Sequence, residues 1–294
     1  MLDKLFDWLG FHLAKLVPLA AALIMLDVLL WWWIIAGVQG MHSLSLNFLN
    51  VGQGDSELVI FPGGRTMLID GGPADGNVLK SLGVLLPPTN RTIDIVALTH
   101  AQADHLSGLI DVLRTYHVGA FVWTGRAGTG SAYSELMRTL KSVHVPMITL
   151  RKGDSIRGGA GIARVLSPNG LLAGSKDLND TSLVLEVAYA STTALFTGDI
   201  AKGAERVLAQ AFPTHVDILK VPHHGSRTAL IDEFVRVLRP ALSVIEVGKN
   251  SYGHPTAEAL ASLASVGSRI FRTDKDGSIT MRITEDGIVH LARR

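Results

Sequence analysis

Cysteine is absent from the 294-residue chain, and neither sign of charge predominates. The lack of cysteine excludes disulfides, cysteine-based zinc sites and a thiol nucleophile. The 27 Lys and Arg residues nearly balance the 26 Asp and Glu residues, so no global basic field attracts nucleic acid, and any anion-binding site must be local. Apolar residues make up 47% of the chain, which excludes a disordered or collagen-like protein and predicts a substantial hydrophobic core.

One long apolar segment lies near the N-terminus. Residues 16–38 carry a single charge, Asp27, and as a helix would be about 34 Å long, enough to cross a bilayer core of about 30 Å. In residues 1–15, leucines recur at helical spacing opposite charged residues, which predicts an amphipathic segment along the membrane surface. Lysines precede the span and no Lys or Arg follows it until Arg65, so the positive-inside rule places the N-terminus in the cytoplasm and the rest outside.

Two alternatives to a retained membrane span stay open: a cleaved signal peptide and a buried core helix. The carboxylate of Asp27 is the main objection to a span, since it costs about 2.5 to 3.5 kcal/mol near mid-helix. A long apolar flank offsets that cost. The run also exceeds the roughly 7 to 15 apolar residues of a usual signal peptide, which favours the retained span.

From residue 43 the pattern changes to short strands and helices separated by glycine-rich turns, and we interpret 43–294 as one domain. Several predicted strands end at residue types that bind metal ions, and a helix is predicted over 106–116. Imidazole nitrogens and carboxylates at this spacing can converge on a divalent metal. The strands at 66–69, 93–98, 192–197 and 216–221 lead, in that order, to Asp70, to His100, Asp104 and His105, to Asp199, and to His223 and His224.

The order Asp-Gly-Gly, His-x-x-x-Asp-His, Thr-Gly-Asp, His-His-Gly-Ser resembles the metallo-β-lactamase superfamily over about 43–291. The resemblance implies an α/β fold, a four-layer αβ/βα sandwich with a metal site at one sheet edge, here preceded by one N-terminal transmembrane helix. The segments LNVGQGDS, LKVPHHGS, YGHP and TDKDG further resemble the hydrolase domain of the ComEC competence family, which takes DNA through bacterial membranes. Full-length members carry many membrane spans, whereas one span is predicted here. We therefore expect a stand-alone, membrane-tethered relative.

The resemblance implies a role for each candidate ligand. His100 belongs to the first metal site, Asp104 and His105 belong to the second, and Asp199 bridges the two. His224 is favoured as the last ligand, because superfamily sites often have His-x-Ser at that point and His-Gly-Ser fits. His223 stays open as the alternative ligand; otherwise it contacts the substrate or supports the site.

Two positions depart from the superfamily pattern. Gln102 stands where His-x-His-x-Asp-His has its second histidine, and Asn179 stands where many members have another histidine. Neutral amide oxygens suit harder ions such as Mn²⁺ or Mg²⁺ better than Zn²⁺. We therefore expect one or two divalent ions, Zn²⁺ or Mn²⁺, with a first site that is weakly filled, filled by Mn²⁺ or empty.

The other candidates surround the predicted ions. Asp70 is expected to hold the site together by hydrogen bonding rather than to bind metal, and Tyr252 to contact the substrate or support the site. His254 is expected to contact the phosphate or protonate the leaving oxygen, which makes it catalytic together with Asp104 and Asp199. Its alternative role is structural, at the start of the next helix.

Basic and aromatic residues give weaker signals. Lys220 and Arg227 beside the histidine pair supply local positive charge or are solvated surface residues. The sequence shows no run of aromatic residues interleaved with basic ones, the pattern typical of proteins that bind single strands.

The resemblance implies a metal-dependent hydrolase, which we interpret as a phosphodiesterase or nuclease that cleaves DNA outside the cytoplasm with a metal-activated water. Two other functions stay open: hydrolysis of a cell-envelope phosphodiester such as a phosphocholine or lipid head group, and a non-catalytic DNA-binding or assembly role. The expected location is the bacterial inner membrane, crossed once, with the catalytic domain outside. The expected partners are the membrane, DNA and a separate competence-type channel protein.

Overall fold

The computed structural model describes residues 16–32, 42–211 and 215–293, which fall into two units, Met1–His42 and Ser43–Arg294. In the first unit a helix with exposed side chains covers 16–32. Within the described ranges, no helix is both long enough and apolar enough to cross a membrane. The end of the predicted span, 33–38, and the predicted amphipathic segment, 1–15, lie outside the described residues.

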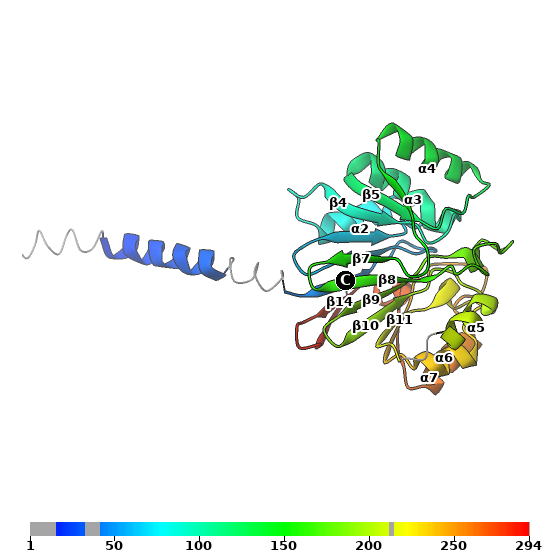
Figure 1. Cartoon of the computed structure of the whole chain (residues 1–294). Coiled ribbons are helices and arrows are strands. Elements are labelled where there is room, and N and C mark those ends of the chain that lie inside the picture. The colour runs from blue at the N-terminus through cyan, green and yellow to red at the C-terminus, as the bar shows by residue number, and fades with distance from the viewer. Residues whose placement is uncertain (1–15, 33–41, 212–214, 294) are drawn as a thin grey trace, which may run out of the picture. The chain divides into compact units, whose positions relative to one another are not determined.

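The second unit contains two mixed β-sheets (Figure 1). In the first sheet the strand order is β15-β14-β1-β2-β3-β4-β5-β6, antiparallel from β15 to β3 and parallel from β3 to β6. Its strands are β1 (Leu44–Phe48), β2 (Glu57–Ile60), β3 (Thr66–Ile69), β4 (Thr92–Ala97), β5 (His117–Trp123), β6 (Met147–Thr149), β14 (Ile279–Ile283) and β15 (Val289–Arg293).

The second sheet has the order β13-β12-β11-β10-β9-β8-β7, parallel from β13 to β10 and antiparallel from β10 to β7. Its strands are β7 (Ser155–Gly158), β8 (Gly161–Ser167), β9 (Val184–Tyr189), β10 (Thr192–Phe196), β11 (Ile218–Lys220), β12 (Leu242–Ile245) and β13 (Arg269–Arg272).

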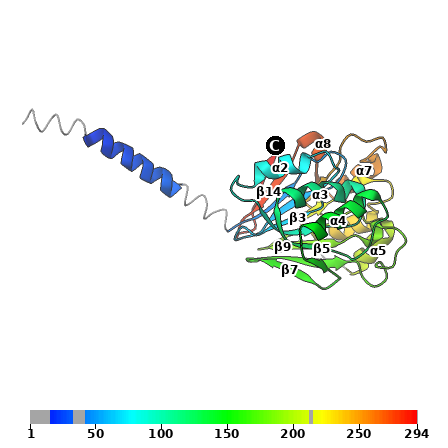
Figure 2. The same ribbon diagram turned by 90° about the horizontal axis from the view of Figure 1, so that it is seen from above.

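Helices cover the outer face of each sheet, which produces four layers. One apolar cluster lies between the sheets, where Phe48 stacks on Phe196 with ring centroids 5.7 Å apart. A second cluster joins the first sheet to α2 (Asn77–Leu85), α3 (Ala103–Thr115) and α4 (Ser131–Ser142), and α3 and α4 lie side by side (Figure 2). A third joins the other sheet to α5 (Lys202–Ala211), α6 (Asp232–Leu238) and α7 (Ala257–Ser265). The predicted α/β fold is thereby confirmed, and a short helix, α8 (Thr273–Asp276), precedes β14.

Helix α3 begins earlier than the sequence pattern predicts, at Ala103 rather than at residue 106. The apolar periodicity starts only at Leu106, so the pattern alone does not include the polar first turn in the helix. Asp104 in that turn favours a helix start, because its carboxylate lies at the positive end of the helix dipole. The correction matters for function, since it places Asp104 and His105 on a rigid helical turn.

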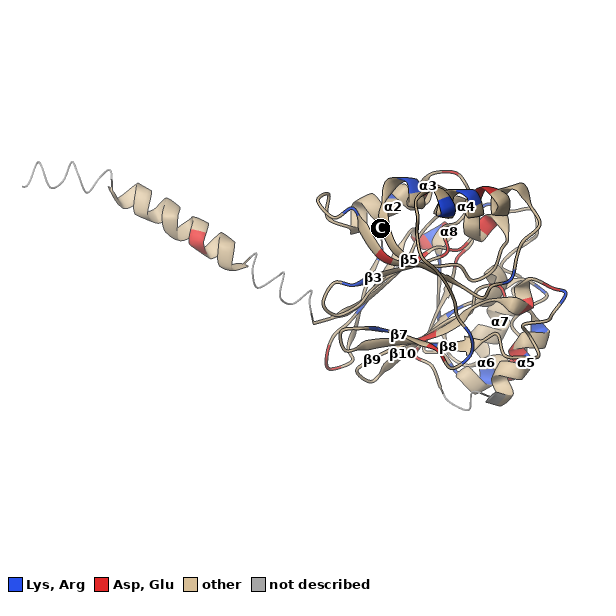
Figure 3. Ribbon diagram, turned by 45° about the horizontal axis from the view of Figure 1, so that its top comes forward, with Lys and Arg blue, Asp and Glu red and all other residues tan. Residues whose placement is uncertain are grey.

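Charged residues of both signs are distributed over the helical layers (Figure 3). Glu135 of α4 pairs with Arg138 of the same helix and with Arg114 of α3, and α5 carries Glu205 between Lys202 and Arg206. This mixture agrees with the formal net charge of +1. An anion must therefore be recognised by a local site rather than by a face of one sign.

Candidate metal centre

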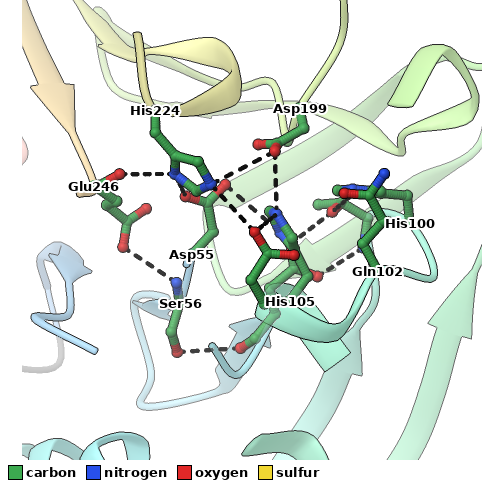
Figure 4. Close-up of polar contacts among 12 residues, drawn as sticks. Asp55, Ser56, His100, Gln102, His105, Asp199, His224 and Glu246 are labelled. Atoms are coloured by element: carbon green, nitrogen blue, oxygen red, sulfur yellow. Dashed lines mark hydrogen bonds and ion pairs between the residues drawn. The ribbon is translucent and has the colours of Figure 1, made fainter. Parts of the chain in front are cut away.

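Four side chains from three segments converge at one edge of the two sheets. Asp104 and His105 come from the first turn of α3, Asp199 follows β10, and His224 lies in the turn η2 (Pro222–Gly225) after β11. One ligand atom from each lies within 4.8 Å of the others. Asp199 Oδ2 is 3.3 Å from His105 Nε2 and 3.6 Å from His224 Nε2, and these groups point toward one another (Figure 4). We call these four residues the metal cluster.

The donor atoms of the metal cluster fit a divalent metal ion. The Nε2 atoms of His105 and His224 and both carboxylate oxygens of Asp199 are buried, and none makes a hydrogen bond within the described part of the chain. Asp104 adds an oxygen 3.6 Å from His224 Nε2. Two imidazole nitrogens with two carboxylates form a donor set suited to Zn²⁺ or Mn²⁺.

The electrostatics of the metal cluster also favour a cation. Burial by itself raises the pKa of Asp199, but His224 and His105 more than offset this and leave that pKa well below its usual value. Burial lowers the pKa of His224, whereas the carboxylates of Asp199 and Asp55 raise it, to about 10. The buried carboxylates thus favour positive charge at this point, which a divalent cation would supply.

Both histidines of the metal cluster are oriented by hydrogen bonds on their far side. The Nδ1 of His105 lies 2.7 Å from Asp70 Oδ2, and Asp70 also accepts hydrogen bonds from the backbone N–H and the hydroxyl of Thr99, at 2.8 and 2.6 Å. The Nδ1 of His224 donates to the backbone carbonyl of Glu246 at 2.8 Å. Because Nδ1 donates on the far side, Nε2 is the atom that each ring turns toward the metal cluster and would offer to an ion on losing its proton.

Asp55, which the sequence did not single out, and Lys220 lie directly behind the metal cluster. Lys220 is fully buried, so its interpretation as a solvated surface residue is wrong. Its ammonium pairs with Asp55, donates to the carbonyl of Gly198 at 3.0 Å and lies 3.6 Å from Asp199 Oδ1. Asp55 Oδ1 is 3.2 Å from His224 Nδ1. The pair therefore touches two members of the metal cluster.

Two other buried carboxyl groups near Lys220 have raised pKa values. Burial and the nearby charge of Asp55 raise the pKa of Glu57 to about 8. Burial and Glu57 likewise raise the pKa of Glu246 well above its usual value. The charge of Lys220 is consequently balanced by Asp55 and Asp199, both of which keep a lowered pKa despite burial.

The loop that carries Asp55 depends on a glycine. A Cβ atom on Gly54 would lie 2.2 Å from the backbone carbonyl oxygen of Asp104, and the φ angle of Gly54 is +151°. No other residue type fits there without moving the start of α3. The segment LNVGQGDS, quoted above only for its resemblance, thus brings Asp55 beneath the metal cluster.

The predicted ligands of the first site are not members of the four-residue metal cluster. Gln102 donates its amide N–H to Asn179 Oδ1 at 2.6 Å, so these two amides bind each other. The ring of His100 lies tilted beside that of His105, with ring centroids 4.2 Å apart, and its Nε2 has no hydrogen-bond partner within the described residues. Burial and His105 lower the pKa of His100 to about 3, which leaves its ring neutral. Any first site would have one imidazole and two mutually bonded amides.

The metal cluster opens into a cavity of about 490 Å³, which we call the entrance cavity. The Asp104 side chain is 36% exposed and faces it. His223 does not join the metal cluster, and its Nε2 lies 3.8 Å from Asp199 Oδ2. The cavity is lined by Gln53, Gln102, Ala103, Asp104, His223, His224, Tyr252 and His254.

The loop with His254 is shaped by Asn250, which the sequence did not single out. The side-chain oxygen of Asn250 accepts hydrogen bonds from the backbone N–H groups of Tyr252 and His254, at 3.1 and 3.0 Å. Its amide nitrogen donates to the carbonyls of Gly248 and His254. One polar side chain therefore fixes the segment that presents Tyr252 and His254 to the entrance cavity.

Comparison with known proteins agrees with this geometry. Residues 65–264 match the family model described as the beta-lactamase superfamily domain, and the chain belongs to the metallo-β-lactamase superfamily. ComE operon protein 3 of Bacillus subtilis is 30% identical over 255 residues, covering 81% of this chain and 33% of that protein. Recombination protein 2 of Haemophilus influenzae is 24% identical over 242 residues, covering 81% and 29%. These matches confirm the resemblance to the ComEC competence family, although the chain spans about a third of either relative's length.

Solved structures with low sequence identity share the fold. The metallo-beta-lactamase fold protein YhfI from Bacillus subtilis has a TM-score of 0.55 at 11% identity, covering 85% of this chain and 100% of that one. CmlA, a diiron beta-hydroxylase from Streptomyces venezuelae, has a TM-score of 0.53 at 14% identity, covering 86% and 54%. At these identities the likeness concerns the fold alone. The fold, the family and the buried His/Asp cluster together define a metal-dependent hydrolase.

We expect protein purified without chelator to hold closer to one metal ion per chain than two. The metal cluster supplies two imidazoles and two carboxylates, whereas the first site supplies only His100 beside the Gln102–Asn179 amide pair. Elemental analysis by mass spectrometry, normalised to protein concentration, checks this ratio. Two tightly held zinc ions per chain would contradict it.

The Gln102→His variant is the matched change for that measurement. It breaks the amide pair and puts an imidazole where the superfamily pattern has one, so metal content should rise toward two and the preference should shift from Mn²⁺ toward Zn²⁺. A metal content unchanged by this variant would show that the amide pair does not limit metal binding at the first site.

Proposed function

We propose that this protein is a metal-dependent phosphodiesterase, a nuclease that cleaves DNA outside the cytoplasm. The observation that carries the proposal is the metal cluster at the base of an open cavity, with Asp104 and His224 on the cavity wall. The kinship with the ComEC family, and a recombination protein among the relatives, favour DNA as the substrate.

In this proposal Asp104, His105, Asp199 and His224 hold the ion. A bound divalent ion lowers the pKa of a water molecule and neutralises charge on phosphoryl oxygens. Asp199 lies between the two histidines and Lys220, so its carboxylate is placed to hold the ion at the centre of the metal cluster. His254 lines the same cavity with a buried Nδ1 that has no partner within the described residues, so its ring is placed to contact the phosphate or the leaving oxygen.

The substrate is tested with the purified full-length chain in detergent, supplied with Mn²⁺, Zn²⁺ or Mg²⁺. We expect cleavage of bis(4-nitrophenyl) phosphate and of single- or double-stranded DNA, and loss of both activities with chelator. Activity on 4-nitrophenyl phosphorylcholine without cleavage of DNA would replace the proposal with an envelope hydrolase. DNA binding without any hydrolysis would replace it with a non-catalytic role.

We further propose that residues 16–38 tether the protein to the bacterial inner membrane and leave the catalytic domain outside the cytoplasm. The apolar run and the two lysines before it support this topology. A separate channel protein of the competence type is the partner that such a tethered nuclease would serve.

Protease treatment of spheroplasts is expected to digest the domain, and the uncleaved chain is expected to sediment with membranes. A cytoplasmic protein examined on the same blot should stay intact. Protection of the domain, or a mature N-terminus near Met41, would overturn the topology.

A further inference from the structure

Two more cavities continue from the entrance cavity along the surface. A cavity of about 370 Å³ shares Tyr252 and His254 with the entrance cavity and adds Arg227 and Glu258. A third, of about 300 Å³, shares Arg227 and Glu258 with the second and reaches Lys202. We call the second and third cavities the Arg227 groove. Shared lining residues make the groove a continuation of the site rather than a separate depression.

A series of aromatic rings leads from the metal cluster to this groove. The ring centroids of His224 and His223 are 6.2 Å apart, those of His223 and His254 are 6.0 Å apart, and those of His254 and Tyr252 are 5.7 Å apart. Tyr252, at the end of the series, is 73% exposed. One side of its ring packs near His254 and the rest faces solvent, as expected of a platform on which a planar group can stack.

The cation beside this platform is available for a ligand. Arg227 is exposed and makes no hydrogen bond or ion pair within the described ranges. It follows His224 by three residues, on the segment between η2 and α6, so the turn that positions the metal ligand also positions the guanidinium. Glu258 lines the same two cavities, and its carboxylate would repel an anion there. Removing Arg227 and removing Glu258 should therefore have opposite effects on the affinity for an anionic ligand.

We propose that the Arg227 groove binds the nucleotide next to the cleaved phosphodiester, with its base stacked on Tyr252 and the adjoining phosphate paired with Arg227. The inference rests on the proposed function and deepens it. A head-group ester needs only the entrance cavity, whereas a polynucleotide continues past the cleaved bond and presents a base and a phosphate at a regular interval. Stacking accepts any base, because every base has a π face, and a planar guanidinium matches phosphate oxygens. The groove therefore distinguishes a polynucleotide from a short ester but does not distinguish one base sequence from another.

The test is fluorescence anisotropy of a fluorescein-labelled single-stranded oligothymidylate with full-length protein in detergent and chelator, which prevents cleavage. Tyr252→Ala should weaken binding about tenfold without changing its salt dependence, and Tyr252→Phe should restore it. Arg227→Gln should weaken binding about three- to tenfold and reduce the slope of log Kd against log salt by about 0.7. Glu258→Gln should tighten binding.

Arg157→Gln is the matched control, because Arg157 is an exposed arginine on β7, at the opposite edge of the second sheet from β13. It should bind as the wild type does. Wild-type affinity in both Arg227→Gln and Tyr252→Ala, or no binding by the wild type, would overturn the groove even if phosphodiesters are hydrolysed. Conversely, binding that depends on Arg227 and Tyr252 in a protein that hydrolyses nothing would keep the groove and reject the nuclease.

Discussion

Replacing Asp199 with alanine should reduce phosphodiester hydrolysis by about a thousandfold or more and remove most of the bound metal. Asp199 Oδ2 lies within 3.6 Å of the Nε2 atoms of both His105 and His224, so its carboxylate is central to the metal cluster. Losing it removes a charged ligand and leaves the two buried histidines without the carboxylate that lies against both of their Nε2 atoms. A bound metal ion contributes several kcal/mol to stabilising charge in the transition state, which corresponds to a rate effect of this size. Asp104→Ala removes the other carboxylate and should also abolish hydrolysis.

The comparison uses initial rates on bis(4-nitrophenyl) phosphate and the metal content of the same preparations. Asp111→Ala is a suitable control: Asp111 lies on α3 like Asp104, but its side chain makes no hydrogen bond or ion pair within the described residues. It should keep both metal and rate. Hydrolysis retained in both Asp199→Ala and Asp104→Ala would attribute the activity to a contaminating nuclease and contradict our assignment of the metal cluster.

Replacing Lys220 with methionine should lower the free energy of unfolding of the domain by about 3 to 5 kcal/mol. Lys220 and Asp55 are both fully buried, and removal of one partner leaves an uncompensated charge in the interior. The buried carboxyl groups of Glu57 and Glu246 cannot take the place of the ammonium, because a carboxyl group supplies no positive charge. Urea unfolding followed by circular dichroism measures the change as a lower midpoint.

Two further variants test whether the loss of stability comes from breaking the buried ion pair or simply from removing a lysine. Lys202→Met, at an exposed position, should have little effect on stability. Lys220→Met combined with Asp55→Asn should recover part of the lost free energy, because it removes the charge that Lys220 balances. A Lys220→Met protein as stable as the wild type would show that the pair is not needed for folding.

The sequence predicted the strands that lead to the metal cluster because each strand and the polar residue after it form one local pattern. The strand over 192–197 followed by Asp199, for instance, matches β10 closely. The pairing of Asp55 with Lys220 was out of reach, since those residues are 165 positions apart and meet only when the two sheets pack together. Short edge strands such as β6 (Met147–Thr149) were also missed, because three exposed residues show no alternation of apolar and polar side chains.

The candidate site shows the same division between local and long-range information. Ligand types could be predicted from their spacing, but the mutual hydrogen bond of Gln102 and Asn179 joins residues 77 positions apart. Arg227 and Tyr252 are also distant in the sequence, and the structure brings them onto one cavity where no interleaved basic and aromatic pattern exists. A sequence argument can name such residues, but only packing shows which of them share a surface.

The central claim is that the ion held by Asp104, His105, Asp199 and His224 drives phosphodiester hydrolysis. The most direct measurement is the rate on bis(4-nitrophenyl) phosphate as metal-free full-length protein is titrated with Mn²⁺ or Zn²⁺, with bound metal determined at each point. We predict a rate that rises in proportion to bound metal and levels off near one ion per chain, and a His224→Ala variant that shows neither tight binding nor turnover. A rate that is independent of bound metal, or undiminished in His224→Ala, would contradict the claim.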